Sequence, residues 1–146
     1  MLGCLRIYET IYTTQLVLEE IEKGMNKGFI EALSIKKLIN KKFIQLKKLG
    51  GKKVSLNLHP GELSVIELAK KIKVDELIVD DKSAISAAKY FGLKVVSTPY
   101  LLLKNLMVKR IDLDTFKIAM NRLIDFGYYI SPNLYVRLLE KAEELS

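Results

Sequence analysis

Apolar residues recur along the chain in two patterns, one typical of buried strands and one typical of helices. Short runs that are β-branched or apolar throughout predict strands, and these lie at residues 10–14, 42–49, 76–80 and 93–98. Apolar positions at helical spacing predict helices between them, at residues 15–24, 28–40, 58–74 and 82–91, with residues 2–9 as the end of a helix. The remainder is predicted to be helical, over residues 99–108, 112–126 and 132–145.

This alternation of strands and helices predicts the fold class. The clearest strands are apolar along their whole length, so both of their faces are expected to be buried. We therefore predict an α/β fold of three α/β/α layers with a mainly parallel sheet and a helical C-terminal tail. Without an internal repeat or a Pro/Ser-rich linker, residues 1–146 are predicted to form a single domain. In such sheets the functional crevice lies at the carboxyl ends of the strands, where Asp80 and Asp81 follow an apolar run.

Composition excludes several classes of protein and site. No apolar run approaches the ~20 residues of a membrane span, and the N-terminus lacks the basic and small-residue features of a signal peptide. The single cysteine, Cys4, cannot form an internal disulfide, so we expect a cytoplasmic protein. With one cysteine and one histidine, His59, a Cys/His zinc site within one chain is excluded, and any metal would be hard and held by oxygen.

Positive charge is concentrated in one part of the sequence. The formal net charge is +7, and the Lys-rich segment (residues 36–53) carries eight lysines and no acid. Such a segment attracts phosphate backbones, with Lys41, Lys42, Lys47 and Lys48 as candidate contacts. The same composition, rich in Lys, Glu and Ile, is also typical of the surface of a heat-adapted protein, and both interpretations can hold together.

Acidic residues remain as candidates for catalysis. The sequence has no glycine-rich phosphate loop, and one histidine and one cysteine leave no credible nucleophilic triad. Glu20, Glu62 and the pair Asp80–Asp81 occupy comparable places after strands or at helix starts. If these carboxylates converge in the crevice they repel one another unless Mg²⁺ or Mn²⁺ neutralises them, and such an ion can activate water against a phosphate.

Each acid also has a structural explanation. Glu62 favours its helix N-terminus through the helix dipole, and Asp81 can cap the helix over 82–91. Glu20 can be solvated surface and His59 a turn residue. The spacing of the acids alone leaves both interpretations open.

The string of residues 58–111, "LHPGELSVIELAKKIKVDELIVDDKSAISAAKYFGLKVVSTPYLLLKNLMVKRI", resembles PIN-domain proteins of the branch with a "GE" middle acid and a "DD" after the next strand. The similarity continues through "FGYYISPNLYVRLLEKAEE" at 126–144. Upstream, "IYTTQLVLEEI" at 11–21 is similar to the family's second strand and helix, with Thr14 in place of the usual proline.

The resemblance implies a ribonuclease that hydrolyses phosphodiesters with Mg²⁺ or Mn²⁺, often as a homodimer and often as a toxin paired with an antitoxin. On this resemblance Glu20, Glu62 and Asp81 match metal-site acids, and Asp80 is the neighbour that replaces or assists Asp81. Ser97 and Thr98 match the polar pair that follows the family's last strand.

The chain departs from the family pattern at its start, because the usual first strand and its Asp have no counterpart in the sequence. Three explanations are open: the natural start lies upstream, another segment such as one from a second subunit fills the gap, or catalysis has been lost and a binding role kept. The functional hypotheses are therefore a PIN-type ribonuclease and a catalytically degenerate module that binds nucleic acid or protein. A nucleotide-binding fold is a third, weakened by the missing glycine loop. The apolar segment 100–108 fits either core or a subunit contact.

Overall fold

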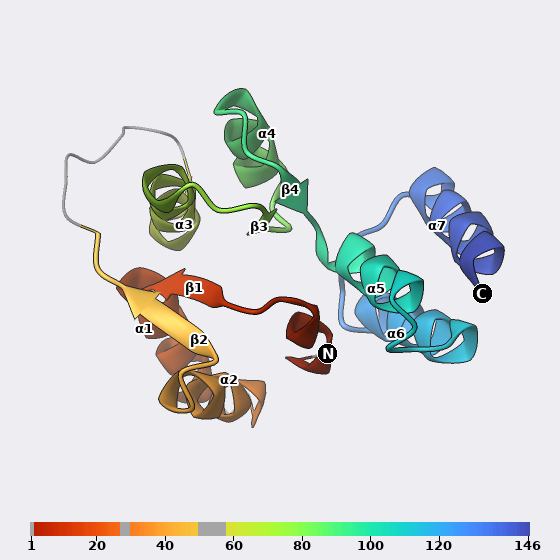
Figure 1. The fold of residues 1–146 in the computed structure, drawn as a ribbon, viewed down its shortest axis with the longest axis horizontal. Helices are drawn as coiled ribbons and strands as arrows, with labels where there is room; N and C mark the ends of the chain where they lie inside the picture. The colour runs from red at the N-terminus through yellow and green to blue at the C-terminus, as the bar shows by residue number, and fades with distance from the viewer. Residues whose placement is uncertain (1, 27–29, 50–57) are drawn as a thin grey trace. The chain divides into compact units, whose positions relative to one another are not determined.

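The computed structural model describes residues 2–26, 30–49 and 58–146, which divide into two compact units. The α/β unit contains Leu2 and Tyr8–Val96, and the helical unit contains Gly3–Ile7 and Ser97–Ser146. Figure 1 shows short strands and helices in the first unit and a group of helices in the second. The described residues thus form a mixed α/β fold with a helical C-terminal region, as the sequence pattern predicts.

The first strand pair lies in the N-terminal half of the α/β unit. Strand β1 (Ile11–Thr14) pairs in parallel with β2 (Ile44–Lys47), with Ile11 opposite Ile44. The connection between them contains α1 (Gln15–Asn26) and α2 (Ile30–Asn40), which contact each other and the strands. A helical crossover is the connection that two parallel strands require.

A second strand pair follows in the same unit. Helix α3 (Pro60–Ile72) leads to β3 (Leu77–Ile78), and α4 (Lys82–Tyr90) leads to β4 (Val95–Val96), which pairs in parallel with β3. Fully buried side chains of α3 and α4, including Ile66, Ala84 and Ala88, form the core here. Helix α3 contacts α1 and β1 as well as α4 and β3, so it joins the two strand pairs.

One buried carboxylate holds the beginnings of three strands together. The Tyr8 hydroxyl donates to Glu76 Oε2 at 2.8 Å, and Lys94 Nζ lies 2.7 Å from Glu76 Oε1. Tyr8 lies three residues before β1, whereas Glu76 and Lys94 directly precede β3 and β4. Burial and the Glu76 hydrogen bond raise the pKa of Tyr8 above its ordinary value. The N-terminal ends of β1, β3 and β4 therefore lie close together.

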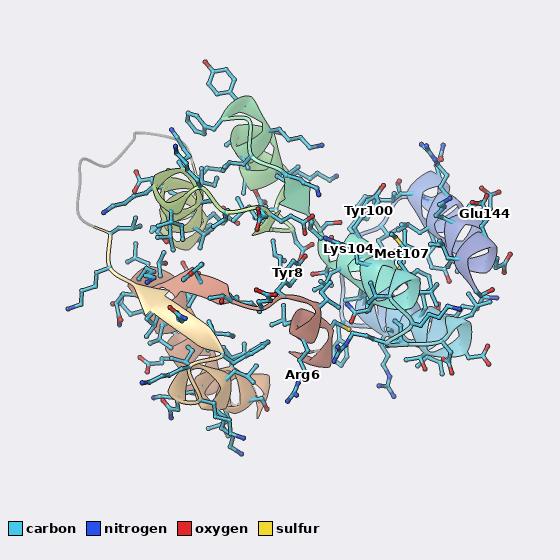
Figure 2. All side chains as sticks on the ribbon, viewed as in Figure 1. Arg6, Tyr8, Tyr100, Lys104, Met107 and Glu144 are labelled. Carbon is cyan, nitrogen blue, oxygen red and sulfur yellow. The ribbon has the colours of Figure 1, made fainter. Side chains whose placement is uncertain are left out.

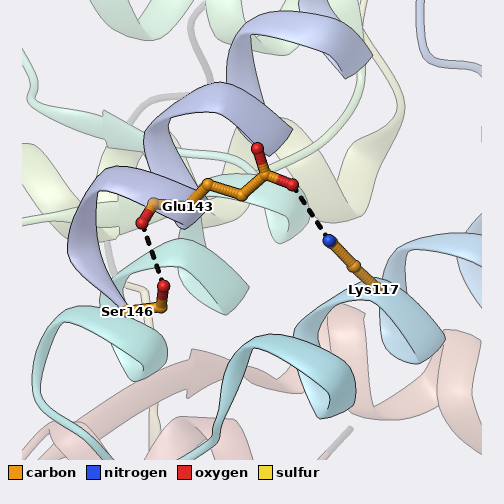
Figure 3. Close-up of polar contacts among 3 residues, drawn as sticks. All are labelled: Lys117, Glu143 and Ser146. Atoms are coloured by element: carbon orange, nitrogen blue, oxygen red, sulfur yellow. Dashed lines mark hydrogen bonds and ion pairs between the residues drawn. The ribbon is translucent and has the colours of Figure 1, made fainter.

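The helical unit has its own core. It consists of residues Gly3–Ile7 of the 3₁₀ helix η1 (Leu2–Ile7), with α5 (Thr98–Met107), α6 (Leu113–Asp125) and α7 (Pro132–Leu145). Phe116 and Met120 are fully buried in its core. Figure 3 shows Lys117 Nζ on α6 bound to Glu143 Oε1 on α7 at 2.9 Å. The buried Asn105 side chain donates to the Cys4 and Leu101 carbonyls, which ties the 3₁₀ helix to α5.

The predicted apolar segment 100–108 lies mainly in this core. The side chains of Leu101, Leu102, Leu103 and Leu106 are buried, whereas Tyr100 and Met107, both labelled in Figure 2, are about half exposed or more. Most of the segment is therefore core of the helical unit. No helix within the described ranges is long and apolar enough to cross a membrane.

Several elements differ from their predicted bounds. Strand β2 is shorter than the predicted 42–49, and the N-terminal 3₁₀ helix ends at Ile7 rather than at residue 9. Helix α1 was expected to end at Gly24 but continues to Asn26, because a glycine lowers helix stability without ending a helix when no breaker follows. Strands β3 and β4 contain two residues each, shorter than the predicted 76–80 and 93–98. Gly50 and Gly51, which follow the predicted strand 42–49, lie outside the described residues.

Candidate metal and nucleic-acid site

A chain of buried hydroxyl groups fixes the end of β1 against the first turn of α3. Ser64 Oγ donates to the Gly61 carbonyl at 2.6 Å, and Thr14 Oγ1 lies 2.6 Å from Ser64 Oγ. Because Ser64 has one hydroxyl proton and gives it to Gly61, Thr14 is the donor to Ser64. Thr14 in turn accepts from the Val17 amide at 3.4 Å and so caps α1. This chain fixes the start of α1 relative to the start of α3.

The fixed start of α1 places Glu20 next to that turn. Glu20 lies on α1, and its carboxylate occupies the space where a side chain on Gly61 would begin. A Cβ atom added to Gly61 would lie 2.5 Å from Glu20 Oε2 and 2.6 Å from Oε1. The carboxylate therefore lies at the N-terminus of α3, where amide groups and the helix dipole favour negative charge.

Glu62 is the next residue of the same turn. It is half-buried, and its Oε2 accepts a hydrogen bond from the His59 amide at 3.3 Å, half of a capping box at the helix start. His59 is the N-cap residue of α3, in agreement with its prediction as a turn residue. The structure thus brings two predicted acids, Glu20 and Glu62, from separate helices to one turn.

Asp80 and Asp81 lie after β3 and are both exposed. Asp81 is the N-cap of α4, and its Oδ1 accepts from the Ala84 amide at 2.9 Å. This confirms the capping role that the sequence allows for Asp81. The other carboxylate oxygen of Asp81 has no part in this cap bond.

The chemistry of these donors fits a hard divalent cation. Carboxylate oxygens are the ligands that Mg²⁺ and Mn²⁺ prefer, and Mg²⁺ is commonly held by one or two carboxylates together with water and phosphate oxygens. The Glu20 carboxylate beside Gly61 is one such group, and the Glu62 carboxylate in the first turn of α3 is a second. Within residues 2–26, 30–49 and 58–146, however, no three His, Cys, Asp or Glu side chains are grouped as a metal would require.

The predicted lysine contacts surround β2. Lys41, Lys42 and Lys48 are exposed, and Lys42 lies in the turn after α2 with a left-handed backbone at φ 58°. Lys47 is the last residue of β2, and its ammonium lies 5.1 Å from the centre of the Tyr12 ring. A shallow depression lies between the end of α2 and β2, lined by Ile39, Lys42, Ile44, Gln45 and Leu46. Lysines on an open surface suit a backbone of phosphates better than a small enclosed ligand.

Ser97 and Thr98, the predicted polar pair, begin the helical unit, whereas the acids belong to the α/β unit. Ser97 is the N-cap residue of α5, and Thr98 is a buried residue of its first turn.

The comparisons with known proteins decide the family. A family model described as "PIN domain" matches residues 2–144. The chain belongs to the PIN-domain family. The mixed α/β fold with short parallel strands agrees with the three-layer PIN fold. No curated protein and no solved structure matches the chain closely enough to add to this assignment.

Family membership gives the general character of the site. PIN domains are nuclease-type modules that bind nucleic acid and generally use divalent metals. In this PIN domain the acids at the start of α3 provide hard oxygen donors, and the Lys-rich segment provides positive charge.

The roles of two residues in this arrangement, Gly61 and Ser64, could not be recognised from the sequence. Ser64 reads as one polar position of an amphipathic helix, and Gly61 as part of a turn. Their contacts are with Thr14 and Glu20, which are distant in sequence. The signal that pointed toward them was the "PGE" turn itself, where a glycine directly precedes a candidate ligand.

Proposed function

We propose that this PIN domain is a ribonuclease that hydrolyses phosphodiester bonds with the help of Mg²⁺ or Mn²⁺. The observation that supports it most is the position of the Glu20 carboxylate against Gly61, immediately before Glu62. Glu20, Glu62 and Asp81 hold the ion in this proposal, and Asp80 assists or replaces Asp81. A bound divalent ion lowers the pKa of a water molecule and offsets the charge of the phosphate.

The chain's own residues divide the remaining work. Lys41, Lys42, Lys47 and Lys48 hold the RNA backbone by charge, and Ser97 and Thr98 supply polar contacts to it. The preference for RNA over DNA is carried by family resemblance, since lysines attract either backbone. The same resemblance underlies the further proposals that residues 1–146 act as a single domain in a cytoplasmic homodimer, and as a toxin held by an antitoxin protein.

The decisive experiment compares isosteric variants in cleavage of single-stranded RNA with Mn²⁺. Glu62→Gln should abolish cleavage, because the amide cannot replace a charged ligand. The same amide oxygen can still accept from the His59 amide, since glutamine also completes a capping box. Asp81→Asn should likewise keep its helix cap and lose cleavage, because Asn is an equally good N-cap.

Glu20 has a matched control on its own helix. Glu19 is also an exposed glutamate of α1, so Glu20→Gln and Glu19→Gln remove the same charge one position apart. Cleavage should disappear in Glu20→Gln and persist in Glu19→Gln. Unchanged cleavage by Glu62→Gln, or equal loss in both α1 variants, would rule out the proposed ligand set.

A second candidate function is a degenerate PIN module that binds a partner without cutting. It is favoured by the absence of a three-acid group within the described ranges and by the use of Asp81 as a cap. It predicts no heat of Mn²⁺ binding by calorimetry and no cleavage with any divalent ion. RNA should then still bind in EDTA, and its affinity should fall with salt. The logarithm of the binding constant should decrease with the logarithm of the salt concentration, with a slope of about −0.7 for each phosphate contacted.

A further inference from the structure

The first turn of α3 contains a glycine at a position where helical geometry does not require one. Gly61 lies within α3 directly after Pro60, and it is buried. The glycines with positive φ are Gly92 and Gly127 among the described residues, so Gly61 has a backbone that any residue could adopt. An alanine would also suit a helix better than glycine. The absence of a side chain at Gly61 must therefore serve a contact.

That contact is with the Glu20 carboxylate. The three atoms nearest to a Cβ built on Gly61 are Glu20 Oε2 at 2.5 Å, Glu20 Oε1 at 2.6 Å and Glu20 Cδ at 2.7 Å. All three belong to the end of one side chain, and each distance is shorter than a carbon atom tolerates. A methyl group on Gly61 and the present position of the Glu20 carboxylate are mutually exclusive.

From this geometry we infer that Gly61 is a positioning residue that sets where the Glu20 carboxylate lies beside Glu62. The missing side chain leaves the space, and the chain of hydroxyls from Thr14 through Ser64 to the Gly61 carbonyl fixes both helix starts around it. The consequence for metal binding rests on the proposed function, whereas the contact itself does not.

A methyl group on Gly61 should displace the Glu20 side chain rather than the backbone of α3. Glu20 is exposed and its side chain is flexible, so it can rotate into solvent when a methyl group takes its place. Gly61→Ala should therefore leave the fold as stable as wild type, or slightly more stable, while it moves one ligand away from the site. Disturbing residues that orient metal ligands typically weakens metal affinity 10- to 100-fold, and we expect a loss in this range.

The test measures the full chain with Mn²⁺ alone, by calorimetry, in a cycle of four proteins: wild type, Gly61→Ala, Glu20→Gln and the double variant. If Gly61 acts through Glu20, Gly61→Ala should weaken Mn²⁺ binding at least tenfold in the wild-type background and leave it unchanged in the Glu20→Gln background. An equal loss in both backgrounds would overturn the inference. Gly3→Ala is the matched glycine control, because nothing lies within 4 Å of its added Cβ.

A second readout separates this inference from the proposed function. The side-chain carboxyl ¹³C resonance of Glu20, assigned by its disappearance in Glu20→Gln, should shift in Gly61→Ala without metal and stay in place in Gly3→Ala. An unshifted resonance would overturn the positioning role whether or not Mn²⁺ binds. Failure of the wild-type chain to bind Mn²⁺, with the resonance shifted, would instead overturn the proposed function and support the contact between Gly61 and Glu20.

Discussion

The hydroxyl chain between β1 and α3 gives a quantitative prediction for stability. Thr14 and Ser64 are 2% and 3% exposed, so neither group can exchange its partner for bulk water. Ser64→Ala removes the acceptor of the Thr14 hydroxyl and the donor to the Gly61 carbonyl. A buried polar group left without a partner costs about 1–3 kcal/mol, and the Gly61 carbonyl loses one bond of about 1 kcal/mol. We expect Ser64→Ala to lower the free energy of unfolding by about 2–4 kcal/mol.

Thr14→Val probes the other end of the chain with little change of shape. It removes the bond to Ser64 and the cap on the Val17 amide, but Ser64 still donates to Gly61. The expected loss is about 2 kcal/mol. In the double variant the Thr14 hydroxyl is no longer present to be left unsatisfied, so the combined loss should fall short of the sum by about 1 kcal/mol.

The assay is urea unfolding of the four proteins of this cycle, followed by circular dichroism. Ser86→Ala is the control, because Ser86 also donates to a helix carbonyl, that of Lys82, but is exposed. It should change stability by less than about 0.5 kcal/mol. The buried hydroxyl chain would be refuted if the losses of Ser64→Ala and Thr14→Val added in the double variant to within about 0.3 kcal/mol. It would also be refuted if Ser64→Ala were as stable as the control.

Three further predictions concern other parts of the molecule. Tyr8→Phe should cost about 1.5–3 kcal/mol in urea unfolding, since it removes a hydrogen bond to the buried Glu76 carboxylate, and an unchanged midpoint would contradict this. Lys73→Gly should raise the melting temperature and increase the free energy of unfolding by roughly 1 kcal/mol. Lys73 is the C-cap of α3 at φ 52°, and glycine adopts this backbone without strain. The Thr115 hydrogen bonds lower the pKa of Asp112, so its contribution to stability is present above the ordinary Asp pKa of about 3.9 and is lost as pH falls through the lower, folded value. Asp112→Asn should flatten that acid-side decline in unfolding titrations, and a slope identical to wild type would exclude the effect.

The local signals in the sequence were sufficient to place most elements. The turn at His59 and the N-cap at Asp81 depend on neighbouring residues, and the structure confirms both. The lengths of β3 and β4 were overestimated, because the apolar runs continue past the residues that form the strands. Val79 is buried beyond the end of β3, where its amide still donates one hydrogen bond to the Val96 carbonyl of β4 at 3.2 Å.

The arrangement of the site was harder to predict, because it depends on contacts between distant segments. That Glu20 and Glu62 share a location follows from the packing of α1 on α3 and from the Thr14–Ser64 bond. The periodicity of apolar residues carries no information on which acids of distant helices lie together. The spacing of the acids named the candidates and the family resemblance favoured a metal site, whereas the structure showed that the Glu20 carboxylate lies against Gly61.

The hydrogen bond from Asn105 to the Cys4 carbonyl bears on how the molecule is made. The two residues are 101 positions apart, yet they belong to one compact unit. At typical synthesis rates of about 5–20 residues per second, roughly 5–20 seconds separate the appearance of Cys4 from that of Asn105. Residues Tyr8–Val96 of the α/β unit are synthesised in that interval, so the segment that contains Cys4 has no partner in its own unit until α5 follows. Assembly of the helical unit is therefore expected to be a late event of biosynthesis, in which an early-made segment joins helices made after it.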